Sequence, residues 1–299
     1  MPELPDIVVY IEALERRVLA HEVTGMRVSS PAVLRTYDPP YDAVVGTKVI
    51  GLNRVGKRIV FELEDDLFLV IHLMIAGRLQ WKAPGTAVPK KVGLAALDFD
   101  EGTLILTEQG SKRRAGIWVL RGADAVAAED RGGIEPLDAD PAEFAAALRK
   151  ENRTLKRALT DPHIFSGIGN SYSDEILWAA RLSPATRTGQ LSDEEVERLR
   201  LAVREQLDKW TELLRQQVGD GWPVKVTAFR NEMAVHGKFN EPCPRCGSPV
   251  QRIAYADNET NYCATCQTGG RLLADRSLSR LLKDDWPRTL DELEEQRRG

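Results

Sequence analysis

The sequence has no long apolar run. The longest apolar stretch, residues 67–76, contains His72 and is far too short to span a bilayer. The first residues, MPELPDIVV, do not show a basic leader followed by an apolar segment, so we expect no signal peptide. These features predict a protein that does not enter the membrane.

Cysteine is also scarce, and positive charge is not in excess. The formal net charge of −4 argues against a protein that coats nucleic acid indiscriminately, although it is compatible with a locally basic surface. The four cysteines all lie between positions 243 and 266, which favours a metal site over scattered disulfides and predicts a reducing, cytoplasmic location. With 299 residues, 42% hydrophobic and 29% charged, the chain has enough material for two domains and a small third module.

The first half of the chain changes from a helical to a β-rich pattern. Apolar residues from Ile7 to Val18 recur at helical spacing, which predicts an amphipathic helix over residues 5–20. Short β-rich runs separated by turn signals follow and indicate an antiparallel sandwich or flattened barrel. The predicted strands are 48–52, 58–63, 67–72, 94–99, 103–107 and 117–120.

The second half is mostly helical. Asp140-Pro141 begins a predicted helix to about residue 150, others cover 153–160 and the residues after Asn170, and Ser192 with Glu195 forms a capping box for a long helix to about 218. Thr289 and Glu292 predict a further helix near the end. The fold class is therefore multidomain α+β. The predicted divisions are a β-sandwich domain at 1–125, a linker at 126–139, a helical domain at 140–225, a zinc module at 226–270 and a partly helical tail at 271–299.

The strongest motif is the cysteine spacing. Cys243-x2-Cys246 and Cys263-x2-Cys266 match a four-cysteine zinc ribbon, in which each pair supplies two thiolates from a tight turn. Four thiolates complete a tetrahedron and leave no open coordination position, so we predict one structural zinc ion. The alternative is a pair of disulfides or free thiols.

The first residues of the chain are compatible with a nucleophilic N-terminal amine. A small second residue such as Pro2 permits removal of Met1, which leaves a free secondary amine. An α-amino group has a pKa near 8, so part of it is neutral and nucleophilic at pH 7. Attack on an aldehydic carbon yields an iminium ion, and Glu3 is placed to move protons. Alone, however, a Met-Pro start is common and usually has no catalytic meaning.

Several such signals occur together and in order. The sequence resembles the Fpg/Nei family of bifunctional DNA glycosylases (formamidopyrimidine-DNA glycosylase and endonuclease VIII) over about residues 1–268. The motifs that carry the resemblance are Pro2-Glu3-Leu4-Pro5, Gly56-Lys57, His72-Leu73 through Gly77, Lys112-Arg113-Arg114, Gly167-Ile168-Gly169-Asn170, Asp174-Glu175 and the four-cysteine finger.

The resemblance implies three catalytic residues. Pro2 matches the nucleophile that attacks C1′ of a damaged nucleotide flipped out of the duplex, after which β- and δ-elimination cut the strand. Glu3 matches the residue that protonates the sugar, and Lys57 matches a lysine that contacts phosphate beside the lesion. Without the resemblance, Lys57 would be interpreted as a solvated surface lysine.

The resemblance also implies a DNA-binding surface. Gly169 and Asn170 match the turn of a helix–two-turns–helix element, in which glycines let backbone N–H groups approach a phosphate. Lys156 matches a phosphate-binding lysine on the preceding helix. Ile75 and Arg113 match residues that fill the space left by the flipped base. The alternative for the Gly-x-Gly-Asn segment is an ordinary turn between helices.

Four departures from the family pattern affect specificity. Asp6 and Val8 replace two glutamates near the start. Ile75 and Ala115 replace a methionine and a phenylalanine that fill the duplex, so a plain 8-oxoguanine:cytosine preference is not assumed. Asn258 stands at the usual position of a finger arginine, for which Arg252 or Arg271 are possible substitutes. The tail beyond Cys266 is longer than the family requires, and either packs on the protein's own surface or docks a partner.

These features lead to three hypotheses. The first is a base-excision repair glycosylase and AP lyase that removes oxidised or ring-opened bases from double-stranded DNA, works as a monomer and associates with the nucleoid when bound to DNA. The second is a zinc-ribbon protein that binds damaged DNA without excising. The third is a glycosylase for bulky or crosslinked bases, because Ala115 leaves room where an aromatic ring would stand. The intact Pro2-Glu3 pair favours an enzyme.

Overall fold

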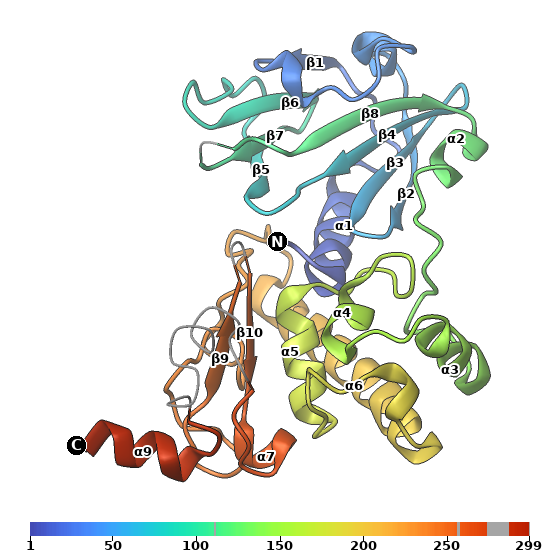
Figure 1. Cartoon of the computed structure of the whole chain (residues 1–299). Helices are drawn as coiled ribbons and strands as arrows, with labels where there is room; N and C mark the ends of the chain where they lie inside the picture. Colours follow the sequence, from blue (N-terminus) through green and yellow to red (C-terminus); the bar gives the residue numbers. More distant parts are fainter. Residues whose placement is uncertain (111, 256–257, 274–286, 299) are drawn as a thin grey trace. The chain divides into compact units, whose positions relative to one another are not determined.

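The chain folds into two compact units, drawn in the computed structural model of Figure 1. Unit 1 comprises Met1–Gly132 and Asp208–Thr227, and unit 2 comprises Gly133–Leu207 and Ala228–Gly299. The structure describes all residues except 111, 256–257, 274–286 and 299. The division falls inside helix α6 (Asp193–Val218), which therefore contributes residues to both units.

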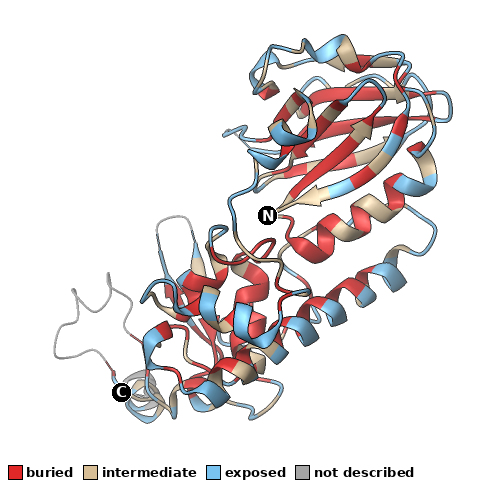
Figure 2. Ribbon diagram, turned by 90° about the vertical axis from the view of Figure 1, so that its right-hand side faces the viewer, coloured by how far each residue is buried: buried red, intermediate tan, exposed pale blue. Residues whose placement is uncertain are grey.

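Helix α1 (Leu4–Val18) opens unit 1 and confirms the predicted amphipathic helix. Ile7, Tyr10, Leu14 and Val18 are fully buried in the core of the unit. Figure 2 shows this burial as red along the helix. On its other face, the Glu12 carboxylate pairs with the guanidinium of Arg215 at 2.6 Å, which joins α1 to the end of α6.

The β-rich region forms two four-stranded antiparallel sheets, which confirms the predicted sandwich. The first sheet has the order β2 (Val49–Val55), β3 (Arg58–Leu63), β4 (Leu67–His72), β8 (Gly116–Arg121). The second has the order β1 (Gly25–Val28), β6 (Gly93–Phe99), β7 (Gly102–Glu108), β5 (Gly77–Lys82). Apolar side chains of both sheets share one core, among them Phe61, Leu69, Ile71, Leu97, Leu104 and Leu106.

Two of these strands, β1 and β5, were not predicted from the sequence. They are the two edges of the second sheet, so each has only one neighbour. Their polar content weakens the apolar signal: Arg27 in β1, for example, is paired with Asp98 of β6 at 2.7 Å. Such strands are defined by their long-range partners more than by their own composition.

Unit 2 contains the predicted helices. They are α3 (Pro141–Arg149), α4 (Leu155–Thr160), α5 (Asn170–Ala179) and the first part of α6. The Asp140 side chain caps α3 by accepting the Ala142 N–H at 2.8 Å. The predicted capping box of α6 is present, because Ser192 and Glu195 each accept a backbone N–H from the other. Among the described residues, short 3-10 helices also occur at Thr188–Gln190 in this unit and at Pro31–Val33 and Tyr41–Val44 in unit 1.

The predicted linker is more ordered than its composition indicated. Its start lies in helix α2 (Ala123–Ala127) of unit 1. Beyond Gly133 it is part of unit 2, where Ile134 exchanges backbone hydrogen bonds with Ile164 and Ser166 at 3.0 and 2.9 Å. The predicted helical domain at 140–225 also differs from the observed division, because Asp208–Thr227 belong to unit 1. Burial of a few apolar residues decides this placement, and no composition shift marks it.

The finger module contains the β9 (Gln251–Ala254) and β10 (Glu259–Tyr262) hairpin, followed by helix α7 (Ala264–Thr268). The predicted helix in the tail is α9 (Leu290–Arg298), and the Glu292 N–H is accepted by Thr289 Oγ1 at 3.3 Å. Leu290 and Leu293 pack against a cluster that includes Ile253, Tyr262 and Leu272. The described part of the tail therefore packs on the protein's own finger, whereas residues 274–286 of the predicted tail lie outside the described residues.

Candidate active site and DNA-binding elements

The chain start is anchored at the N-terminus of α1. Pro2 and Glu3 are buried, and Glu3 is the N-cap residue of the helix. The Glu3 backbone N–H donates to the Asp6 carboxylate at 3.0 Å. Asp6, which departs from the family glutamate, thus fixes the backbone of the residue beside Pro2.

The charges around this chain start favour a neutral amine. The pKa of the Met1 α-amino group is lowered, chiefly because burial penalises its charged form. The Glu3 carboxylate opposes this shift, whereas the cations Arg78 and Lys57 reinforce it. When Met1 is removed, the amine becomes the Pro2 nitrogen, directly beside Glu3.

Lys57 is held in the turn between β2 and β3, where Gly56 adopts a left-handed φ of 59°. The Arg54 guanidinium donates to the Gly56 carbonyl at 2.6 Å and fixes that turn. Burial lowers the pKa of the Lys57 ammonium, and the Glu3 carboxylate raises it. Lys57 is therefore a half-buried cation in the electrostatic range of Glu3, and not the solvated lysine of the alternative interpretation.

His72 is a neighbour of this cluster to which the sequence assigned no role. It ends β4 opposite Arg58 and Gly116. The His72 pKa is lowered to about 4, mainly because the imidazole is buried. The positive charges of Arg58 and Lys57 lower it further. The imidazole is therefore neutral at pH 7, where it can exchange hydrogen bonds but adds no charge.

Of the three residues that were matched to duplex-filling side chains, two are exposed and one is not. Ile75 is 56% exposed, and Arg113 is exposed with its guanidinium on the Lys91 carbonyl. Ala115 is only 2% exposed and lies in the core, and its N–H donates to the Glu108 carboxylate at 2.9 Å. The position of Ala115 therefore offers no side chain to DNA.

In unit 2, the turn before α5 is built by glycine. Gly167 has a left-handed φ of 78°, a conformation that favours glycine, whereas Gly169 is extended and serves as the N-cap of α5. Asn170 is the first residue of α5, and its side chain donates to the backbone carbonyl of Glu259 in the finger at 2.9 Å. This contact places the predicted phosphate-binding turn against the finger hairpin.

Lys156 does not have the exposed position that a direct phosphate contact would require. It is 9% exposed, and its ammonium donates to the Asp174 carboxylate and to the Asn170 backbone carbonyl, both at 2.6 Å. The sequence could not reveal this pairing, because Lys156 and Asp174 lie on different helices. The structure therefore places Lys156 behind the Asn170 turn.

The pair Asp174-Glu175 links α5 to the finger module. Asp174, which is fully buried, also accepts from His236 Nδ1 at 2.7 Å and from the Asn261 backbone N–H at 3.1 Å. Glu175 accepts three consecutive backbone N–H groups of residues 234–236 at 2.8 to 3.0 Å. Burial raises the Glu175 pKa, and these hydrogen bonds oppose the rise. Two adjacent carboxylates thus fix both the segment before the finger and its hairpin.

We expect Asp174→Asn to lower the free energy of unfolding of unit 2 by about 3–5 kcal/mol, because it leaves the buried Lys156 ammonium without a countercharge. Urea denaturation measures this loss. Asp193→Asn is the matched control: its partner is Arg149, its side chain is 89% exposed, and a loss below about 1 kcal/mol is expected. Equal losses in the two variants would contradict the assigned role of Asp174.

The four cysteines meet at one point. All four Sγ atoms lie within 4.8 Å of one another, with Cys246–Cys263 at 3.4 Å and Cys243–Cys266 at 3.9 Å. Tetrahedral Zn²⁺ with Zn–S bonds of about 2.3 Å requires S–S separations of about 3.8 Å, so the set fits zinc. The Trp178 indole N–H donates to Cys243 Sγ at 3.3 Å, and Arg245 stacks on that indole. The predicted structural zinc site is confirmed.

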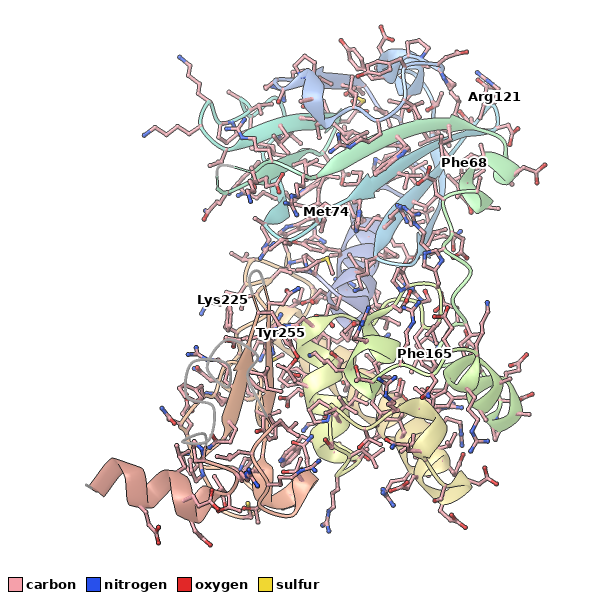
Figure 3. The ribbon with its side chains drawn as sticks, viewed as in Figure 1. Phe68, Met74, Arg121, Phe165, Lys225 and Tyr255 are labelled. Atoms are coloured by element: carbon pink, nitrogen blue, oxygen red, sulfur yellow. The ribbon has the colours of Figure 1, made fainter. Side chains whose placement is uncertain are left out.

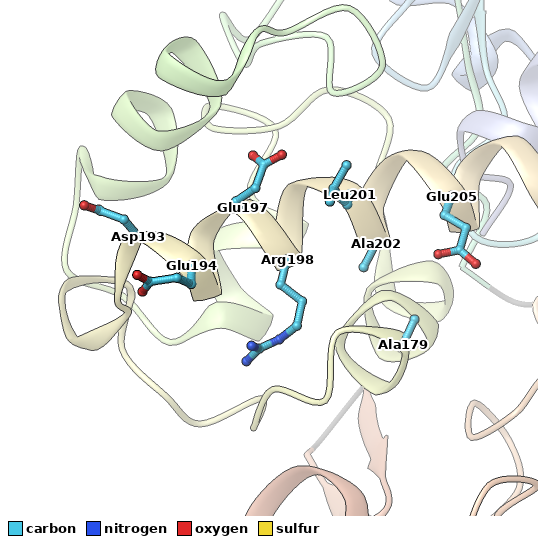
Figure 4. A pocket seen from close by; sticks show the side chains of 8 residues that line it. All are labelled: Ala179, Asp193, Glu194, Glu197, Arg198, Leu201, Ala202 and Glu205. Atoms are coloured by element: carbon cyan, nitrogen blue, oxygen red, sulfur yellow. The ribbon is translucent and has the colours of Figure 1, made fainter.

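A surface hollow of about 690 Å³ in unit 2 lies between the first turns of α6 and the end of α5 (Figure 4). Four carboxylates line it, against the single cation Arg198, whose Nε donates to the Ala180 carbonyl. An excess of carboxylates disfavours a phosphate group at this surface. The acidic residues are Asp193, Glu194, Glu197 and Glu205.

The segment after α6, for which the sequence predicted no structure, is anchored in unit 1 by Trp222. Its indole N–H donates to the Leu79 carbonyl at 2.9 Å, and its ring packs on Tyr10 at 5.7 Å. Val226 is buried in the same core, whereas Val224 between them is 82% exposed. An isolated tryptophan in a loop was the one available signal for this anchor.

No helix in the described part of the chain is long and apolar enough to cross a membrane.

Models of three protein domains match the chain. They are the formamidopyrimidine-DNA glycosylase N-terminal domain at residues 1–117, the formamidopyrimidine-DNA glycosylase H2TH domain at 133–218, and the zinc finger found in FPG and IleRS at 240–269. The matches cover the sandwich with the chain start, the helices with the Asn170 turn, and the cysteine cluster.

Full-length relatives agree with these domains. The formamidopyrimidine-DNA glycosylase of Chloroflexus aurantiacus is 32% identical over 278 residues, which are 89% of this chain and 98% of the relative. That of Lactococcus lactis subsp. cremoris is 30% identical over 275 residues, 89% of this chain and 99% of the relative. A solved structure of the Lactococcus lactis protein in complex with DNA containing an abasic site has a TM-score of 0.77 at 27% identity, covering 89% of this chain and 99% of that one. The chain therefore belongs to the formamidopyrimidine-DNA glycosylase family.

Proposed function

We propose that this protein is a base-excision repair enzyme that removes oxidised or ring-opened bases from double-stranded DNA and cleaves the strand at the resulting abasic site. The observation that carries the proposal is the buried Pro2 beside Glu3, because its nitrogen becomes the terminal amine once Met1 is removed. The Met1 amine at this chain start has a lowered pKa, to which the charge of Lys57 contributes. Solved relatives support the substrate class, since they hold DNA with Fapy-dG, an abasic site or an oxidised pyrimidine.

The chemistry follows from an amine, an acid and a cation. The neutral Pro2 nitrogen attacks C1′, the bond from C1′ to the base breaks, and the base leaves with a proton. Glu3 protonates the sugar ring oxygen, so that the ring opens to an iminium ion. Loss of the C2′ proton then expels the 3′ phosphate by β-elimination, and δ-elimination expels the 5′ phosphate. Lys57 neutralises phosphate charge beside the reacting sugar.

In unit 2, the proposed DNA contacts are made by the α5 turn and the finger. The Gly169–Asn170 turn presents the positive end of α5 to a backbone phosphate. Lys156 supports this turn from behind by binding the Asn170 carbonyl. The zinc holds the finger hairpin, whose Glu259 carbonyl in turn binds the Asn170 side chain.

In this proposal, Ile75 and Arg113 determine which lesion and which opposite base the enzyme accepts. Both are exposed, and Ile75 provides apolar volume that wedges into a base stack. Ala115 is buried, so no third side chain fills the duplex from that position. This observation favours the bulky-base hypothesis as the second candidate. Excision rates on a panel of oxidised, ring-opened and bulky bases would separate the two.

The decisive experiment is borohydride trapping of the Met1-processed protein on duplex DNA with one abasic site. The expected result is a covalent adduct that maps to the N-terminal peptide, because borohydride reduces an iminium ion to a stable amine. Salt-dependent binding without an adduct would overturn the enzymatic proposal and favour the damage-binding hypothesis. An adduct that maps to an internal lysine would reject Pro2 as the nucleophile.

We further propose that the enzyme acts as a monomer in the cytoplasm and associates with the nucleoid through DNA. The thiolates of a four-cysteine zinc site are stable in that reducing compartment. Sedimentation of the protein alone and with an abasic duplex tests the stoichiometry, and one protein per lesion is expected.

A further inference from the structure

The turn that carries Ile75 is tightly constrained. It joins β4 of one sheet to β5 of the other, and the Gly77 N–H donates to the Leu73 carbonyl at 2.8 Å. Met74, labelled in Figure 3, has a left-handed φ of 52°, which is uncommon for a residue with a side chain. A Cβ atom at Gly77 would lie 2.2 Å from the Leu73 carbonyl oxygen, so glycine is required there.

Arg78, the second residue of β5, folds its side chain back onto this turn. Its Nη1 donates to the Gly77 carbonyl at 2.6 Å and to the Ile75 carbonyl at 3.2 Å. The Arg78 backbone is itself fixed, because it pairs with Thr107 of β7. One guanidinium on a rigid strand therefore holds two carbonyls of the turn that presents Ile75.

The same guanidinium lies in the electrostatic range of the chain start. Four charged groups act on the amine of Met1, which precedes Pro2: Glu3 at the N-cap of α1, Asp6 in α1, Lys57 from the β2–β3 turn, and Arg78 from β5. Of the two cations, Arg78 has the larger effect in lowering the pKa of this amine, and its charge also acts on the buried Tyr10 of α1. Arg78 thus touches the turn that bears Ile75 and acts on the site of the proposed nucleophile.

We propose that Arg78 is a positioning residue that couples these two parts of the active site: it holds the Ile75 turn in the shape that inserts into DNA, and it provides a fixed positive charge beside the terminal amine. This inference rests on the proposed function. Because arginine donates from a planar fork and lysine from a single point, the two roles can be separated by substitution.

The experiment compares Arg78→Lys and Arg78→Met with the wild type. Arg121→Met is the matched control, because the Arg121 guanidinium also braces a turn, by donating to the Asp65 carbonyl at 2.8 Å. Arg121 pairs with Leu67 at the end of β4 away from His72, and Figure 3 labels it there. Two quantities are measured: the pH dependence of acylation of the terminal amine in the DNA-free protein, and the single-turnover rate of base excision.

Arg78→Met is expected to move the acylation profile to higher pH, on the order of one pH unit, because loss of the cation lets the amine hold its proton more strongly. It is also expected to slow excision about tenfold to a hundredfold, because the Ile75 turn is displaced. Arg78→Lys keeps the charge and should leave the acylation profile in place while excision still slows. Arg121→Met should change neither quantity.

An unchanged acylation profile and an unchanged excision rate in Arg78→Met would overturn the inference. Equal slowing in Arg78→Met and Arg121→Met would also overturn it, since a general loss of turn stability would then explain the effect. Acylation is measured without DNA, so it tests the charge of Arg78 even if the wild type excises no base. In that case the proposed function fails, and the acylation result still decides the placement of Arg78.

Discussion

Replacing Pro2 by glycine is expected to slow covalent trapping on abasic DNA at least about a hundredfold. Glycine leaves a primary amine on a flexible residue, whereas the proline ring fixes the nitrogen against the start of α1. A displacement of about 1 Å at a reacting atom costs on the order of a hundredfold in rate. The Asp6 carboxylate holds the next residue, Glu3, so the change is confined to the nucleophile.

Single-turnover trapping with borohydride, at saturating protein, measures this effect apart from DNA affinity. Pro5→Ala is the matched control, because Pro5 lies in the first turn of α1 and leaves the terminal amine untouched. A second variant adds one residue before Pro2, which converts its nitrogen to an unreactive amide. Trapping of Pro2→Gly at the wild-type rate would show that the proline ring is not needed. Trapping of the extended variant at that rate would show that an amine other than the Pro2 nitrogen forms the adduct.

Replacing Cys263 by serine is expected to unfold the finger module and to weaken DNA binding at least about a hundredfold. Structural zinc contributes about 10–16 kcal/mol of apparent folding free energy, far more than the small apolar cluster around it. That cluster consists of Val235, Val250, Cys243 and Cys263, so two ligands are themselves part of its core. The sandwich of unit 1 has its own core and should remain folded.

Zinc content, circular dichroism and affinity for an abasic duplex measure the outcome. Glu241→Gln is the control within the same module: the Glu241 side chain is 55% exposed and pairs with the Lys238 ammonium at 3.1 Å, so zinc should stay at one ion per chain. If Cys263→Ser kept one zinc ion and wild-type affinity, the cysteine set would not be the metal site. Removing zinc from the wild type with a chelator should reproduce the effect of Cys263→Ser.

Local patterns in the sequence determined a large part of this protein. The spacing from Ile7 to Val18 defined α1, the Ser192–Glu195 box defined the start of α6, and the cysteine spacing defined the zinc site. Each of these features depends on residues that are close together in the sequence, within a few helical turns or one hairpin, so the sequence pattern alone is enough to predict it. The motif at the chain start, taken with the others, also identified the family.

Only the tertiary structure decided which residues share a site. It buried Lys156 against Asp174, placed Ala115 in the core, and brought the charge of Arg78 into range of the chain start. It also defined the edge strands β1 and β5 through partners far along the chain. The physical reason is that charge pairing and burial depend on distances between elements. The sequence alone does not show whether a lysine binds a phosphate at the surface or pairs with a buried carboxylate.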